Sequence, residues 1–204
     1  MILSDKKLLT LGKEGFFVGP KEKEDVFLQR VNFLKKLRDD PSYYANELPA
    51  DSERVCLKEW KTLAEALEKK MGCSPNWLFA YYSKEQLAPW QGAACWIFTH
   101  PSGFCFPRIQ IRPSFKKGRA FLCSFREVLE HEVVHALRCS FSEPCFEEVF
   151  ASFLSLRKWR RFLGAIFRTA KEALFFAALC IFLIATEVSL FFLGSLNEVV
   201  FVFM

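Results

Sequence analysis

Apolar residues recur at helical spacing in two segments of the first half of the chain. Residues 25–37 carry them every three or four positions and end before Pro41, which predicts a helix with a firm stop. Residues 51–71 repeat the pattern with acids early, lysines late and Gly72 just past the end, an order that suits the helix dipole. Residues 1–20 contain three glycines and a proline without a sustained period, which predicts an irregular or weakly strand-forming start.

The pattern changes to β-branched and aromatic runs broken by Pro and Gly between residues 90 and 124. Three short strands are predicted here: Ala93–Thr99, residues 106–112 and residues 119–123. The second run alternates polar and apolar residues with the period of two that a strand requires.

A capping box then opens a helix. Ser124 and Glu127 stand three residues apart ahead of an apolar run, which predicts a helix over residues 125–138. After a short connection, Pro144 suits the start of a second helix, residues 144–157, folded back antiparallel on the first. Together these elements predict an α+β domain with a small sheet and a helical hairpin.

Residues 173–194 form the most hydrophobic segment of a chain that is 51% hydrophobic. As a helix they extend about 33 Å, close to the roughly 30 Å of a bilayer's hydrocarbon core. Their 13 Leu, Ile, Val and Phe residues contribute about −0.3 to −0.6 kcal/mol each, which outweighs about +3 kcal/mol for Glu187. A transmembrane helix is predicted; the alternative is a buried helical hairpin broken near Glu187.

The net charge of +5 is concentrated beside this segment. Of 28 basic and 23 acidic residues, six basic and one acidic lie in residues 155–172, so the other 22 of each sign balance. Such a cluster favours a membrane surface over a nucleic acid, for which no recognition motif is present. The basic side of a membrane helix faces the cytoplasm, which predicts a single-pass C-terminal anchor with residues 1 to about 165 in the cytoplasm.

The predicted organisation therefore has three parts. We expect residues 1–89 to form the mainly helical N-terminal part of one domain, residues 90–160 its core, and residues 161–204 a basic stretch and the membrane helix. The eight cysteines include no C-x-x-C pair and follow no secretory signal, so we expect reduced, mostly buried thiols.

Two of the three histidines fall in the segment His131-Glu132-Val133-Val134-His135. Residues i and i+4 share a helix face one turn apart, so both imidazoles can bind one tetrahedral zinc ion. Glu132 lies about 100° around the helix from His131, where it can take a proton from the water that zinc activates. The segment predicts hydrolysis of a peptide or amide bond with Glu132 as general base.

Catalytic zinc needs a third protein ligand. The predicted hairpin brings Glu147 and Glu148, one turn into the second helix, near His135. Here the sequence resembles the gluzincin branch of zincin metallopeptidases, in which H-E-x-x-H is followed by a glutamate in an E-x-x-A setting, matched by Glu148-Val149-Phe150-Ala151. The resemblance implies a zincin-like fold, one Zn²⁺ held by His131, His135 and Glu148, and Glu147 as the fallback ligand.

The sequence offers several candidates for the groups that recognise the substrate. Candidate donors to the transition state are His100, Arg138 and one of Tyr81 or Tyr82. The family likeness also implies a strand at the cleft edge that pairs with an extended peptide or protein substrate, either residues 106–112 or Ala93–Thr99.

Two other interpretations are open. A deformylase-like amide hydrolase would use a cysteine as third ligand, and Cys123 and Cys139 are the nearest in sequence. A membrane-anchored interaction module would carry the motif as a structural or vestigial zinc site, which four protein ligands would close.

Overall fold

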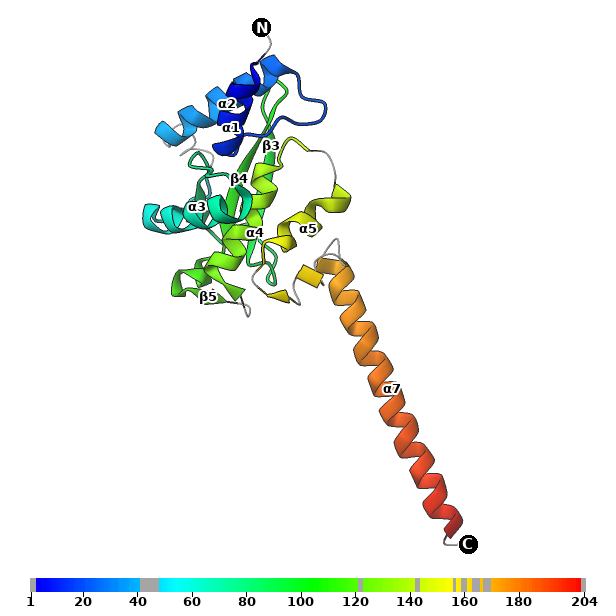
Figure 1. Cartoon of the computed structure of the whole chain (residues 1–204). Coiled ribbons are helices and arrows are strands. Elements are labelled where there is room, and N and C mark those ends of the chain that lie inside the picture. Colours follow the sequence, from blue (N-terminus) through cyan, green and yellow to red (C-terminus); the bar gives the residue numbers. More distant parts are fainter. Residues whose placement is uncertain are drawn as a thin grey trace.

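A mixed four-stranded sheet lies at the centre of the body in the computed structural model, which describes residues 3–40, 48–120, 123–141, 144–155, 157–158, 161–162, 166 and 170–202 (Figure 1). The strands are β1 (Glu53–Arg54), β2 (Ala80–Tyr82), β3 (Ala93–Thr99) and β4 (Cys105–Ile111), in the order β1-β2-β4-β3. β2 runs parallel to β4, and the other two pairs are antiparallel. β3 therefore forms one edge of the sheet.

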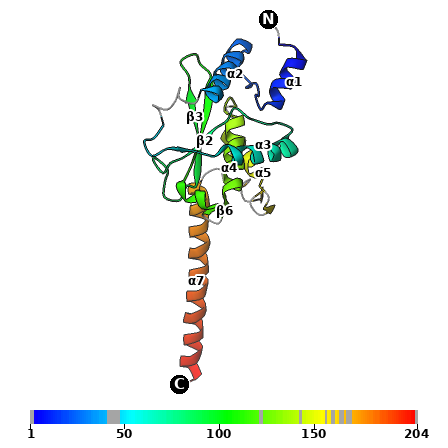
Figure 2. The ribbon, with the colours of Figure 1, turned by 90° about the vertical axis from the view of Figure 1, so that its left-hand side faces the viewer.

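The helices gather on one side of this sheet and at one end of it (Figure 2). The first two are α1 (Asp5–Lys13) and α2 (Glu24–Asp39), and α3 (Leu57–Met71) follows β1. The helix α4 (Phe125–Leu137) packs on β3 and β4, while α5 (Pro144–Phe153) packs on α4 rather than on the sheet. A 3₁₀ helix, η2 (Pro113–Lys117), leads into a small second sheet.

The predicted α+β class is confirmed, and α4 begins where the capping box places it. Ser124 Oγ accepts a hydrogen bond from the Glu127 backbone N–H at 3.2 Å, and the Glu127 carboxylate accepts one from the Ser124 N–H at 3.0 Å. Leu129 and Val133, four residues apart, are buried against the sheet together with Ile109. The cap fixes the start of α4, and these apolar side chains fix its rotation.

The prediction for the first twenty residues is wrong, because α1 occupies Asp5–Lys13. Leu8 and Leu11, three residues apart, give this helix a narrow apolar side that packs on the core. Gly15 follows the helix at φ +82°, and a Cβ there would lie 2.9 Å from Leu137 and from Pro75. The glycine thus marks a close approach after a helix and not an irregular segment.

The remaining differences are in element boundaries. The helix predicted from residue 51 begins at Leu57, because Glu53–Arg54 pair with β2 instead. β2 itself was not predicted, since three fully buried residues are too short to show a period. Residues 119–123 form two paired two-residue strands, β5 (Arg119–Ala120) and β6 (Cys123–Ser124), and α5 ends at Phe153 rather than at 157.

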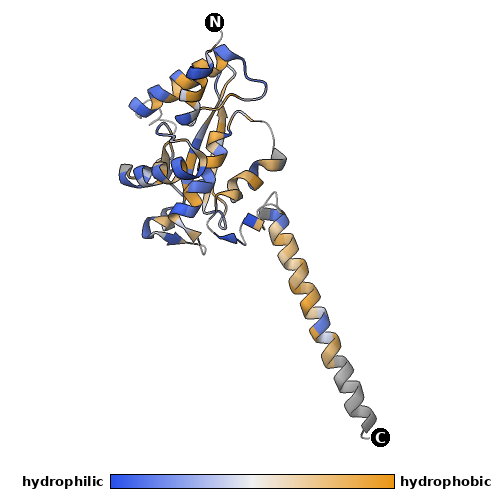
Figure 3. Cartoon of the chain, in the orientation of Figure 1, coloured by the Kyte–Doolittle hydropathy of each residue, from blue (hydrophilic) through white to orange (hydrophobic). Residues whose placement is uncertain are grey.

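The C-terminal helix α7 (Ala170–Val202) is continuous and extends away from the body (Figure 1). Within it, Lys171–Phe192 is long and apolar enough to cross a membrane, with a mean hydropathy of 2.4, and none of this span is buried in the protein. In Figure 3 most of the coloured part of this helix is hydrophobic, with a short hydrophilic interruption. The alternative of a buried helical hairpin broken near Glu187 is therefore wrong.

The structure describes part of the basic stretch and most of the cysteines. Arg160 and Arg168 of the basic stretch lie outside the described residues, whereas Lys158, Arg161 and Lys171 are exposed. Seven cysteines are free thiols in the part of the chain that the structure describes.

Replacing Ser124 by alanine tests the cap. We expect Ser124→Ala to lower the free energy of unfolding by about 1 kcal/mol, because the Glu127 N–H loses its acceptor at the start of α4. Thermal or urea unfolding of the purified protein measures the change.

Ser4→Ala is the matched control. Ser4 occupies the same N-cap position on α1 but makes no side-chain capping hydrogen bond, so its replacement should leave stability nearly unchanged. Equal losses in the two variants would contradict a specific contribution from the capping box.

Candidate metal centre

Two imidazoles of α4 point into one cleft. Because Leu129, Val133 and Ala136 face the core, the helix turns His131 and His135 toward α5 and the edge strand. The two Nε2 atoms lie 3.3 Å apart, and the ring planes meet at 76°. The predicted pairing of the histidines one turn apart is thus present in the fold.

Glu148 reaches both imidazoles from α5. One carboxylate oxygen lies 3.4 Å from His131 Nε2 and the other lies 3.6 Å from His135 Nε2. Burial opposes charge on this carboxyl, but the hydrogen bond with His131 and the nearby imidazole charge outweigh it and lower its pKa. His131, His135 and Glu148 form a group that could hold a metal ion, with one donor atom from each within 4.8 Å of the others.

Glu147 lies on the far side of His135. One of its carboxylate oxygens is 3.3 Å from His135 Nδ1, and the other accepts a hydrogen bond from Arg138 Nε at 3.1 Å. Burial opposes charge on the His135 ring, but Glu147 and the charges of Glu132 and Glu148 outweigh it, so the pKa of His135 is raised. Since Nδ1 faces Glu147, Nε2 is the nitrogen left to bind an ion, as in carboxylate–histidine–metal arrangements.

Glu132 is buried between α4 and the edge strand. Its side chain is largely shielded from solvent, at 8% exposure, and its carboxylate accepts a hydrogen bond from the backbone N–H of Cys95 on β3. Burial raises its pKa, an effect that the two imidazoles partly offset. A carboxyl group with a raised pKa is suited to accepting and returning a proton near neutral pH.

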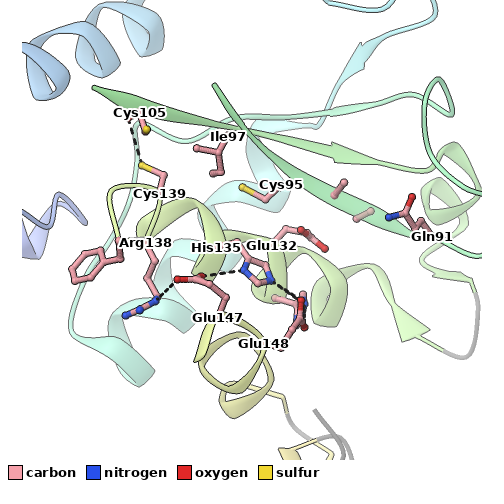
Figure 4. Close-up of a pocket in the computed structure, with 14 residues that line it drawn as sticks. Gln91, Cys95, Ile97, Cys105, Glu132, His135, Arg138, Cys139, Glu147 and Glu148 are labelled. Atoms are coloured by element: carbon pink, nitrogen blue, oxygen red, sulfur yellow. Dashed lines mark hydrogen bonds and ion pairs between the residues drawn. The ribbon is translucent and has the colours of Figure 1, made fainter. Parts of the chain in front are cut away.

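These groups share one open cavity of about 530 Å³ (Figure 4). The α4 and α5 side chains form one side, and the edge strand β3 forms the other. The lining residues from β3 and the segment before it are Gln91, Ala93, Ala94, Cys95 and Ile97. Because the Cys95 N–H donates to Glu132, the free edge of β3 faces the candidate metal ligands.

The candidate donors to the transition state separate into two groups. Arg138 lines the cavity and holds Glu147. His100 lies in the β3–β4 turn, stacked on Phe104, and Tyr81 lines a separate cavity of about 280 Å³. Tyr82 packs near Phe125, and burial raises its pKa to about 12. Of the four, only Arg138 is among the described residues that line the metal cavity.

The two cysteines considered as ligands point elsewhere. Cys139 lines the cavity, but its Sγ donates to the Cys105 carbonyl at 3.7 Å, and burial raises its pKa to about 11, which disfavours the thiolate. Cys123 is buried in β6, ahead of the first turn of α4. Neither thiol belongs to the group formed by the two histidines and Glu148 among the described residues.

The roles of Arg138 and of the Cys95 backbone were not predicted. The sequence offers Arg138 only as a candidate donor to the transition state, because no spacing along the chain pairs a residue at the end of one helix with Glu147 on the next. The role of the Cys95 N–H could not be predicted from residue type, because every residue except proline has a backbone N–H. The strand that contains it, Ala93–Thr99, was predicted as a candidate cleft edge.

We compared the chain with known proteins and found no relative. The chain matches no protein-family model, no curated protein and no solved structure.

Separate replacement of the two glutamates of α5 tests whether Glu148 is the metal ligand and Glu147 the partner of His135. Glu148→Ala should abolish retention of a divalent metal ion, because it removes one of three ligands. Glu147→Gln should keep the ion but weaken its affinity by about 10–100-fold, the usual effect of losing a partner of a ligating histidine. Metal analysis of the purified variants and competition with a chelator measure both.

Glu65→Ala, an exposed acid on α3, serves as the control and should retain the metal like the parent. If Glu147→Gln lost the metal entirely while Glu148→Ala kept it, the two assignments would have to be exchanged.

Proposed function

We propose that this protein is a zinc-dependent metallopeptidase of the zincin type, similar to the gluzincin branch. The observation that carries the proposal is the convergence of His131, His135 and Glu148 beside the buried Glu132. The distances among the three ligand groups are 3.3, 3.4 and 3.6 Å. Ligand atoms about 2.0–2.1 Å from a tetrahedral zinc ion are about 3.3–3.4 Å apart, so the donor set suits zinc closely.

When bound, zinc would lower the pKa of water to near 7 and polarise the carbonyl oxygen of an amide. Three protein ligands leave one position open, which is typical of a catalytic site rather than of a closed structural one. This favours an enzyme over an interaction module with a structural zinc site. The orientation of Cys139 toward Cys105 likewise favours Glu148 over a deformylase-like cysteine ligand.

Glu132 moves the proton in this reaction. Its carboxylate accepts a proton from the attacking water and passes it to the leaving amine, which would otherwise depart as an unstable amide anion. The Cys95 N–H holds the carboxylate in place, and burial keeps it away from competing solvent. Arg138, fixed by Glu147, is the candidate to donate to the developing oxyanion.

The edge strand β3 is the candidate binding surface for an extended peptide. Apart from the Cys95 N–H, which Glu132 uses, its outward-facing backbone N–H and C=O groups can pair with a substrate strand laid along the cavity. β4 lies between β2 and β3, so of the two strands considered only β3 has an edge to offer. Main-chain pairing of this kind aligns a scissile bond without demanding particular side chains.

The helix α7 is proposed to anchor the enzyme in a membrane as a single C-terminal span. The exposed Lys158, Arg161 and Lys171 precede it or stand at its start, which favours a cytoplasmic location for the body. The partners are then a peptide or protein substrate and the lipid bilayer.

Glu132→Gln tests the catalytic proposal. The amide cannot accept a proton, so hydrolysis of casein or a peptide library should fall by at least about 100-fold while the protein keeps its zinc. Initial rates and metal content of the parent and the variant measure this.

The control is Glu65→Gln, which should hydrolyse the same substrates as fast as the parent. Parental activity in a folded, zinc-loaded Glu132→Gln protein would refute the assignment of the base. A parent that hydrolyses no substrate would favour the interaction module instead.

Extraction of membranes with alkaline carbonate tests the anchor. The full chain should stay in the membrane pellet, and protease added to the cytoplasmic side should degrade the body. Replacing Leu183 and Ile184 with lysine costs about 6 kcal/mol in the middle of the span and should release the protein. Release of the unaltered chain by carbonate would exclude a spanning helix.

A further inference from the structure

The outer side of α5 carries three exposed phenylalanines. Phe146, Phe150 and Phe153 are 56%, 45% and 71% exposed. At 100° per residue, they lie within about 60° of one another around the helix axis and form a single stripe. We call Phe146, Phe150 and Phe153 the α5 stripe.

The opposite side of the same helix builds the candidate metal centre. Glu148 reaches the two histidines there, and Ala151 is buried at 1% exposure in the core. The inner and outer sides are bridged by Arg138, whose guanidinium lies 4.2 Å from the centre of the Phe150 ring and also binds Glu147. α5 therefore has one apolar face toward solvent and one functional face toward α4.

The surroundings of the α5 stripe indicate what covers it. The chain that follows α5 carries exposed positive charges at Lys158 and Arg161 and exposed apolar side chains at Phe162 and Ile166. It then enters the apolar span of α7. Figures 1 and 2 show α5 on the part of the body near the start of α7, with α1 at the opposite end. Phenylalanines combined with basic residues are typical of surfaces that bind the interface of anionic membranes.

We propose that the α5 stripe docks into the surface of the membrane that α7 spans, an inference that rests on the proposed anchoring. The aromatic rings would enter the boundary between headgroups and acyl chains, while the basic residues beside them bind anionic headgroups. One helix separates this surface from the ligands, so the metal centre lies about 10–12 Å from the lipid. Polypeptide segments close to the membrane are then the substrate class within its reach.

Site-specific photocrosslinking of the full chain tests this docking. The photoreactive residue p-benzoylphenylalanine replaces Phe153, and the protein is reconstituted in vesicles of phosphatidylcholine and phosphatidylglycerol. Leu9 is the matched control, since it is 69% exposed and belongs to α1, the helix at the far end of the body. Ile181 in α7, 68% exposed, reports on the anchor itself.

We expect lipid adducts at position 153 to exceed those at position 9 by at least about tenfold, as burial of one face in the interface requires. Adducts at position 153 with a second copy of the chain, or lipid adducts no more frequent than at position 9, would overturn the docking while position 181 still labelled lipid. Absence of lipid adducts at position 181 would instead overturn the anchor, and the docking with it. A thermal unfolding midpoint equal to that of the parent verifies that each labelled protein is folded.

Discussion

The packing of α4 against the sheet is the constraint on which the rest of the structure depends. Leu129 and Val133 hold one side of the helix on β4, and this burial decides which way every other residue of α4 points. A rotation by one residue would move the side chains by 100° and turn His131 and His135 away from α5. The hydrophobic core thus sets the direction of the imidazoles before any metal ion contributes.

The contact between α4 and α5 is the second requirement, and charge supports it. Glu147 accepts a hydrogen bond from Arg138 at the end of α4 and approaches His135 in its last turn. Without a metal ion, Glu147 and Glu148 concentrate negative charge that, among the described residues, Arg138 and the two imidazoles offset. Binding a divalent cation would relieve this repulsion, so we expect the hairpin and the ion to stabilise each other.

Local patterns predicted the elements whose signals lie within a few residues of each other. The capping box gave the first residue of α4, and the strand pattern gave both ends of β3. The i to i+4 spacing of the histidines predicted their pairing for the same reason. β2 and the hydrogen bond from the Cys95 N–H to Glu132 arise only when distant segments meet, so no local pattern contains them.

The two faces of α5 connect the candidate metal centre with the membrane proposal. Its inner face is held by the buried Ala151 and by the ion pair between Glu147 and Arg138. Arg138 also covers the Phe150 ring, so movement of α5 away from α4 would break contacts on both faces at once. If lipid covers the outer face, movement of α5 away from α4 would carry it toward that lipid, so the three phenylalanine rings would stay out of water. The contacts of Ala151 and Glu147 with the body must therefore hold Glu148 near the histidines without help from the docking.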